Sequence, residues 1–103
     1  MAEDDQMWRV SGLHRFQVVR CVVTGHRDRF GVEVSITDPE SSVPAFIDFV
    51  MLSDDIRHPK PADFPEVGSV FDAVTLDFMP GGELRLSARA SSVARQRARD
   101  TES

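Results

Sequence analysis

The residues best suited to binding chemistry stand together in one short segment. Residues 25–30 read Gly-His-Arg-Asp-Arg-Phe, and this polar run follows a stretch rich in valine. Guanidinium and imidazole groups can bind phosphate oxygens, and a phenyl ring can stack on a nucleobase. The segment therefore predicts a phosphate-and-base contact made by His26, Arg27, Arg29 and Phe30. The alternative, which the sequence leaves open, is an ordinary charged loop whose phenylalanine closes one end of the core.

Other reactive residue types lack the spacing that catalysis or metal binding requires. Three histidines are scattered along the chain, and the single cysteine, Cys21, lies among valines, where a small buried side chain is expected. Asp54 and Asp55 are adjacent, but no glycine-rich phosphate loop accompanies them. No serine lies in a nucleophile-elbow pattern. We therefore expect a binding module and not an enzyme, with no catalytic residue, metal or cofactor.

Length and composition favour one globular domain. The chain has 103 residues, of which 41% are hydrophobic and 28% are charged. No apolar run approaches the roughly 20 residues that span a bilayer. The first six residues, Met-Ala-Glu-Asp-Asp-Gln, lack the basic and apolar layout of a signal peptide. These features predict a cytoplasmic protein that has no membrane partner.

The net charge of −5 hides a segregated pattern. Residues 9–29 contain five arginines and one aspartate, a net charge of +4, and residues 89–99 contain four arginines and no acid. Residues 30–88 contain three basic and eleven acidic side chains, a net charge of −8. Such segregation can steer a charged partner. It is equally compatible with solvated faces that neutralise one another in the fold.

Alternation of apolar and polar residues predicts an all-β chain. Five stretches have this pattern or are rich in β-branched residues: 16–24, 32–36, 45–50, 70–78 and 84–88. Residues 38–42 are a loop by composition, residues 80–82 a tight Pro-Gly-Gly turn, and residues 51–68 a proline-containing crossover. Five short strands with one long connection between the third and the fourth predict a five-stranded Greek-key barrel of the OB type.

The two ends of the chain lie outside the predicted barrel. We expect an N-terminal extension over residues 1–14, the barrel over residues 15–90 and a basic tail over residues 91–103. The tail is compatible with a short helix or with a flexible segment that contacts phosphates. Trp8, the one tryptophan, either covers an open end of the core together with Leu13 or serves as an exposed anchor for a protein partner.

Several stretches, taken in order, resemble the S1-type RNA-binding domain, a family of OB-fold barrels. The matching stretches are Val-Thr-Gly at 23–25, Phe-Gly-Val at 30–32, the third strand leading into Leu-Ser at 46–53, Val-Gly at 67–68 and Gly-Glu-Leu-Arg-Leu-Ser at 82–87. The resemblance covers roughly residues 15 to 90. It implies the binding of single-stranded RNA across the second and third strands, by aromatic stacking with basic side chains around it.

Only some of the family's RNA-contact residues are matched in this sequence. Phe30 matches the first stacking phenylalanine, whereas the second falls at Glu33. The family's histidine falls at Asp48 and a frequent arginine falls at Glu83, although Arg85 is expected on the same face. Carboxylates cannot stack on a base and they repel phosphates.

Two hypotheses follow. The main one is a protein-interaction module, an adaptor or inhibitor-like barrel that engages a basic protein surface through an acidic and partly apolar face. Alternation of side chains places this face at Glu33, Phe46, Asp48, Val50 and Glu83. The alternative is single-stranded RNA binding by His26, Arg27, Arg29, Phe30 and Arg85.

Overall fold

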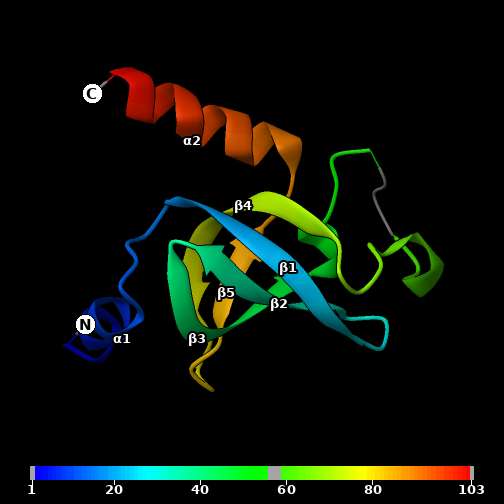
Figure 1. The fold of residues 1–103 in the computed structure, drawn as a ribbon, viewed down its shortest axis with the longest axis horizontal. Coiled ribbons are helices and arrows are strands. Elements are labelled where there is room, and N and C mark those ends of the chain that lie inside the picture. Colours follow the sequence, from blue (N-terminus) through cyan, green and yellow to red (C-terminus); the bar gives the residue numbers. More distant parts are fainter. Residues whose placement is uncertain (1, 56–58, 103) are drawn as a thin grey trace.

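Five strands close into a barrel in a computed structural model that describes residues 2–55 and 59–102 (Figure 1). The strands follow one another around the barrel in the order β1-β2-β3-β5-β4, with β1 hydrogen-bonded to β4. Their bounds are β1 (Val18–Arg27), β2 (Gly31–Asp38), β3 (Glu40–Asp48), β4 (Val70–Phe78) and β5 (Leu84–Ser87). The pair β3–β5 is parallel and the others are antiparallel. The predicted five-stranded OB-type barrel is confirmed.

Strand boundaries differ from the prediction around β3. The expected loop at residues 38–42 is shorter, because Glu40 pairs with Thr37 and Ser41 pairs with Ile36. The turn is made at Pro39, which follows a cis peptide bond. At its other end β3 stops at Asp48, and Phe49–Met51 form a 3₁₀ helix, η1, that begins the long connection to β4. A second 3₁₀ helix, η2 (Pro61–Asp63), follows in that connection.

Alternating side chains of all five strands fill the barrel. Within β1 the buried residues are Val19, Cys21 and Val23, and the residues between them are more exposed. Ile36, Ile47, Leu84 and Leu86 are also fully buried. Cys21 is fully buried, so it is a core residue, as the sequence predicts. Its burial, together with the charge of Asp72, raises the pKa of the thiol to about 12.

Two helices flank the barrel. Helix α1 (Ala2–Ser11) is not predicted from the sequence, because its hydrophobic periodicity is weak. Trp8 explains why it forms: its ring meets the edge of Phe78 with centroids 4.7 Å apart, and it packs against the core together with Leu13. A helix this short depends on such packing.

The C-terminal basic segment is helical. Helix α2 (Ala90–Glu102) contacts β4 and β1 (Figure 1) and buries Val93. Asp54 binds its first turn by accepting hydrogen bonds from the Ser91 backbone N–H (2.8 Å) and hydroxyl (2.6 Å). These bonds and the Arg89 guanidinium hold the pKa of the Asp54 carboxyl below its usual value. Within the described residues, no helix is long and apolar enough to cross a membrane.

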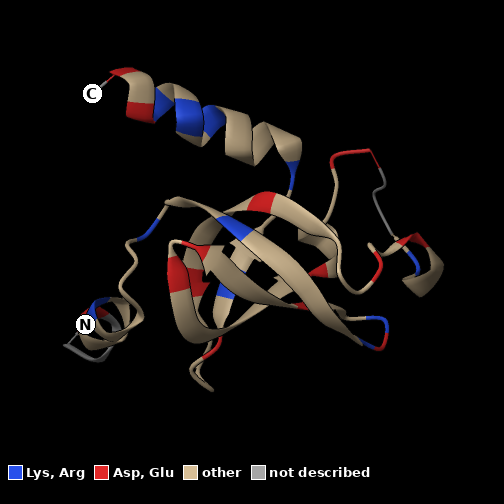
Figure 2. Ribbon diagram, in the orientation of Figure 1, with Lys and Arg blue, Asp and Glu red and all other residues tan. Residues whose placement is uncertain are grey.

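Basic and acidic residues that are segregated in the sequence lie on neighbouring elements of the fold (Figure 2). Asp72 of β4 pairs with Arg20 of β1 and with Arg97 of α2, and Asp54 pairs with Arg89. These pairs join arginines of the two basic segments to acids of the middle segment. The charge pattern of the sequence therefore reflects, in large part, neutralisation within the molecule.

Candidate nucleic-acid interface

Arg27, the last residue of β1, is bound to two carboxylates on the outer face of the barrel. Its Nε and Nη2 donate to Glu33 Oε2 on β2, at 3.1 and 3.0 Å. Its Nη1 donates to Oε1 of Glu83, just before β5, at 2.9 Å, and its Nη2 also donates to Glu83. Hydrogen bonds from Arg27 hold the pKa of Glu83 below its usual value, and the same bonds raise the pKa of Arg27. This arginine therefore neutralises half of the formal charge of the two acids and leaves the cluster with a formal charge of −1.

Phe46 lies beneath this guanidinium. Its position in the strand pairing, opposite Glu33 and Arg85, places it on the outer face as predicted. Its side chain is nevertheless only 4% exposed, with the guanidinium carbon of Arg27 above its ring, 4.4 Å from the ring centroid. The expectation that Phe46 is an exposed apolar contact is therefore wrong. Alternation along a strand gives the direction of a side chain, but not what covers it.

The other residues of the predicted protein-binding face differ in their surroundings. Asp48 accepts a hydrogen bond from the Val50 backbone N–H at 3.4 Å and so caps η1. Val50 is exposed, but it belongs to η1 and not to the strand. The structure thus places Glu33 and Glu83 around Arg27, and it places Val50 beyond the end of β3.

Arg85, which the RNA-binding hypothesis includes, is paired within the barrel. Its Nε and Nη2 donate to the two carboxylate oxygens of Asp77, both at 2.8 Å. These bonds lower the pKa of Asp77 and raise that of Arg85. A phosphate would have to compete with this two-bond pair.

His26 also has a structural partner. Its Nε2 lies 2.7 Å from the Pro65 carbonyl oxygen, and its ring meets the edge of Phe64 with centroids 5.8 Å apart. It therefore joins β1 to the long connection between β3 and β4.

Arg29 and Phe30 remain available at the turn between β1 and β2. Phe30 is 50% exposed, and the Arg29 guanidinium carbon lies 5.5 Å from its ring centroid. Both line a hollow of about 350 Å³, whose other lining residues are Phe49, Pro59, Lys60 and Pro61. Within the described part of the chain, neither Arg29 nor Lys60 has a carboxylate partner for its side chain. We call this hollow the Arg29–Phe30 pocket.

Sequence reasoning missed one wall of this pocket. The wall comes from the long connection, where Phe49 opens η1 and Pro61 opens η2. The three prolines of this connection signal an irregular segment. They do not indicate which strand end the segment folds against.

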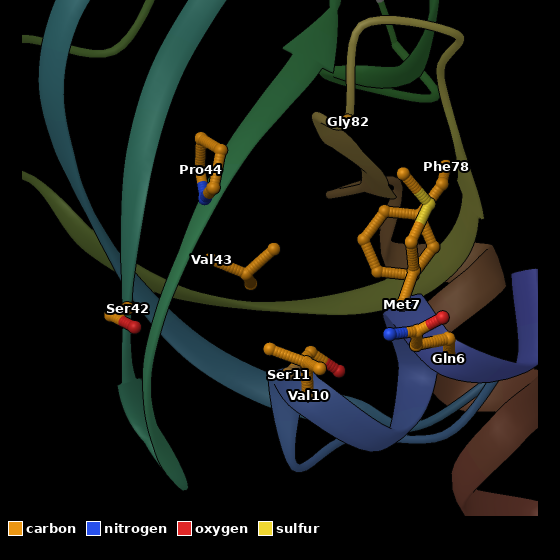
Figure 3. A pocket seen from close by; sticks show the side chains of 9 residues that line it. All are labelled: Gln6, Met7, Val10, Ser11, Ser42, Val43, Pro44, Phe78 and Gly82. Atoms are coloured by element: carbon orange, nitrogen blue, oxygen red, sulfur yellow. The ribbon is translucent and has the colours of Figure 1, made fainter. Parts of the chain in front are cut away.

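A larger hollow of about 520 Å³ lies between α1 and the barrel (Figure 3). Side chains of α1, β3 and β4 border it, among them Met7, Val43 and Phe78. The described residues that line it include no titratable side chain and none of the predicted binding residues. Among the described residues, no cluster of histidine, cysteine and acidic side chains could hold a metal ion.

Comparison with known proteins places the fold. The sequence matches no family model and has no significant match among curated proteins. The structure is similar to a chain of the a/eIF2alpha–aDim2p–rRNA complex from Pyrococcus horikoshii (TM-score 0.64, 15% identity) and to GSP13 from Bacillus subtilis (TM-score 0.61, 18% identity). A multidomain protein with nucleic acid binding domains from Streptococcus pneumoniae also matches (TM-score 0.51, 21% identity).

These matches cover 86%, 77% and 82% of this chain but only 53%, 58% and 27% of the respective neighbours. At such identities the similarity shows the fold alone. Together with the strand order, it shows that this chain forms an S1-like barrel of the OB type.

Proposed function

We propose that this barrel is a non-catalytic module that binds single-stranded RNA, with the Arg29–Phe30 pocket as its main contact. One observation carries the proposal: a half-exposed aromatic ring borders a hollow beside two cations that lack carboxylate partners in the described chain. Stacking on the ring and charge attraction to phosphates are the two general interactions by which proteins hold single strands.

The acidic residues of the face are a weaker obstacle than the sequence suggests. Of the three carboxylates that oppose phosphate binding in the sequence, Glu33 and Glu83 are bound to Arg27, and only Asp48 is not. The cluster of these three residues has a formal charge of only −1. The paired Arg27 guanidinium also covers Phe46, which is therefore no longer an exposed apolar contact of the predicted patch. This weakens the case for a basic protein partner.

The structural neighbours support the same choice. One of them belongs to a complex that contains rRNA, and another is described as having nucleic acid binding domains.

The test is fluorescence anisotropy with a labelled single-stranded RNA of about 15 nucleotides, titrated at several salt concentrations. We expect micromolar or tighter binding that weakens steeply with salt. Phe30→Ala should weaken binding about tenfold, because base stacking contributes roughly 1–3 kcal/mol. Arg29→Ala should weaken binding and flatten the salt dependence, since one phosphate contact is lost.

The chain offers a matched control for both variants. Phe16 is 42% exposed, and the Arg15 guanidinium carbon lies 5.1 Å from its ring centroid, so this pair resembles Arg29–Phe30 but lies outside the pocket. Phe16→Ala should leave the Kd unchanged. Absence of binding at low salt, or equal effects of Phe16→Ala and Phe30→Ala, would refute the proposal. Affinity capture with the Glu33→Lys/Asp48→Lys variant would then test the protein-binding alternative.

A further inference from the structure

Arg27 differs from Arg29 in how many of its guanidinium N–H groups remain free to bind a ligand. A guanidinium has five N–H donors, all in its plane. Four hydrogen bonds from Arg27 go to the carboxylates of Glu33 and Glu83. Arg27 therefore cannot make a two-bond contact with a phosphate unless it releases a carboxylate.

The two flat faces of the Arg27 guanidinium have different surroundings. One face covers the ring of Phe46, at 4.4 Å from the centroid. The side chain as a whole is still 33% exposed. Because the edges point at carboxylates and one face lies on Phe46, the opposite face is the part of the guanidinium that these contacts leave uncovered. Such a face is planar, weakly hydrated and able to stack on a nucleobase.

The Arg27 side chain belongs to the same turn as the Arg29–Phe30 pocket. The Phe30 backbone N–H donates to the Arg27 carbonyl oxygen at 2.9 Å, so both residues belong to one turn. Gly31 follows Phe30 in the chain, and a Cβ added to Gly31 would lie 3.0 Å from Phe46 Cζ. The Phe46 ring therefore packs against the buried backbone of Gly31, the residue that follows Phe30 in the turn.

We infer that Arg27 is a second stacking platform for a nucleobase, acting through the face of its guanidinium and not through its charge. This inference rests on the proposed RNA binding and deepens it. Glu33 and Glu83 hold the platform in place, and Phe46 supports it from below. A strand would stack one base on Phe30 and another on Arg27, while the phosphates contact Arg29 and Lys60.

The inference separates the roles of two arginines in one turn. Arg29 contributes to the salt dependence of binding, because it releases counterions from a phosphate. Arg27 contributes to affinity without changing the salt dependence, because its charge is balanced within the cluster.

The decisive variant is Arg27→Lys, which keeps the charge but removes the planar face. With the same labelled RNA, we expect about tenfold weaker binding and an unchanged slope of log Kd against log salt. Arg29→Lys is the matched control and should change the Kd little, since a phosphate accepts a lysine ammonium as well. A Kd for Arg27→Lys equal to that of the unchanged chain would overturn the inference, and so would a flattened salt slope.

A second measurement does not depend on the folding of a variant. RNAs that each lack one base at a different position are titrated against the unchanged protein. Two positions should be sensitive to base removal, one for each platform. If only one position is sensitive, while the RNA still binds and Phe30→Ala still weakens that binding, the role of Arg27 is refuted and the proposed function stands. No binding of any strand would overturn both.

Discussion

At the scale of single residues, the partner of each charged group decides what that group can do. Arg27 and Arg29 are two positions apart, yet one is bound to two carboxylates and the other faces the open pocket. Residue type alone would give them the same role. The partner of Arg27 at Glu83 lies 56 positions away along the chain, so only the closed barrel reveals it.

Gly31 shows the same dependence for a backbone position. Its φ of +147° is unfavourable for other residues, and a Cβ there would lie 2.1 Å from the Ile47 carbonyl oxygen. We expect Gly31→Ala to lower the free energy of unfolding by at least about 3 kcal/mol, through strain and displacement of β3. Urea titration measures this. Gly81→Ala, where nothing lies within 4 Å, is the control and should cost less than about 1 kcal/mol.

At the scale of elements, the irregular connection and the terminal helices add surfaces that the five strands alone do not form. The connection after β3 supplies η1 and η2, which bear Phe49 and Pro61 of the pocket wall. The two helices lie at different places on the barrel, with α1 against β3 and α2 against β4 and β1 (Figure 1). Neither helix contributes to the lining of the Arg29–Phe30 pocket.

Docking of α1 depends on Trp8. We expect Trp8→Ala to lower the free energy of unfolding by about 2 kcal/mol, because the ring packs against Phe78 and the core but is only partly buried. Thermal or urea unfolding followed by circular dichroism measures the loss. Val10→Ala in the same helix is the control: Val10 is 81% exposed, so its removal should leave stability unchanged or slightly raised. Equal effects of the two substitutions would show that α1 does not depend on the Trp8 contact.

At the scale of the whole molecule, the ion pairs connect segments that are distant in sequence. Asp72 joins β4 to β1 and to α2, and Glu83 joins the start of β5 to the end of β1. The net charge of −5 therefore does not describe the field at the Arg29–Phe30 pocket, which Arg29 and Lys60 border. A chain of negative net charge can still attract phosphates locally.

These pairs predict acid sensitivity. The folded-state pKa values of Glu83 and Asp77 lie below their ordinary values of 4.5 and 3.8, because Arg27 and Arg85 donate hydrogen bonds to the carboxylates. A lowered folded pKa stabilises the fold above the ordinary value, and this stabilisation is lost as pH falls through the lowered value. We expect the Tm to fall as pH drops below about 4.5.

Glu83→Gln isolates one contribution to that fall. The Tm of this variant should depend less steeply on pH in the acid range, because its side chain no longer takes up a proton. Glu66→Gln is the control, since the exposed Glu66 side chain has no ion pair in the described chain, and it should keep the original slope. Identical slopes for Glu83→Gln and the unchanged chain would contradict the assignment to Glu83.

The sequence by itself determines the barrel and where the loop between its first two strands lies. Alternation with a period of two and the Pro-Gly-Gly turn are local signals, so they predict the strands, the long connection and the loop that carries Phe30. Only the tertiary structure decides which residues of that face are available. Burial of Phe46, docking of α1 and the pocket wall at Phe49 and Pro61 all depend on contacts between distant segments, and no local pattern encodes such contacts.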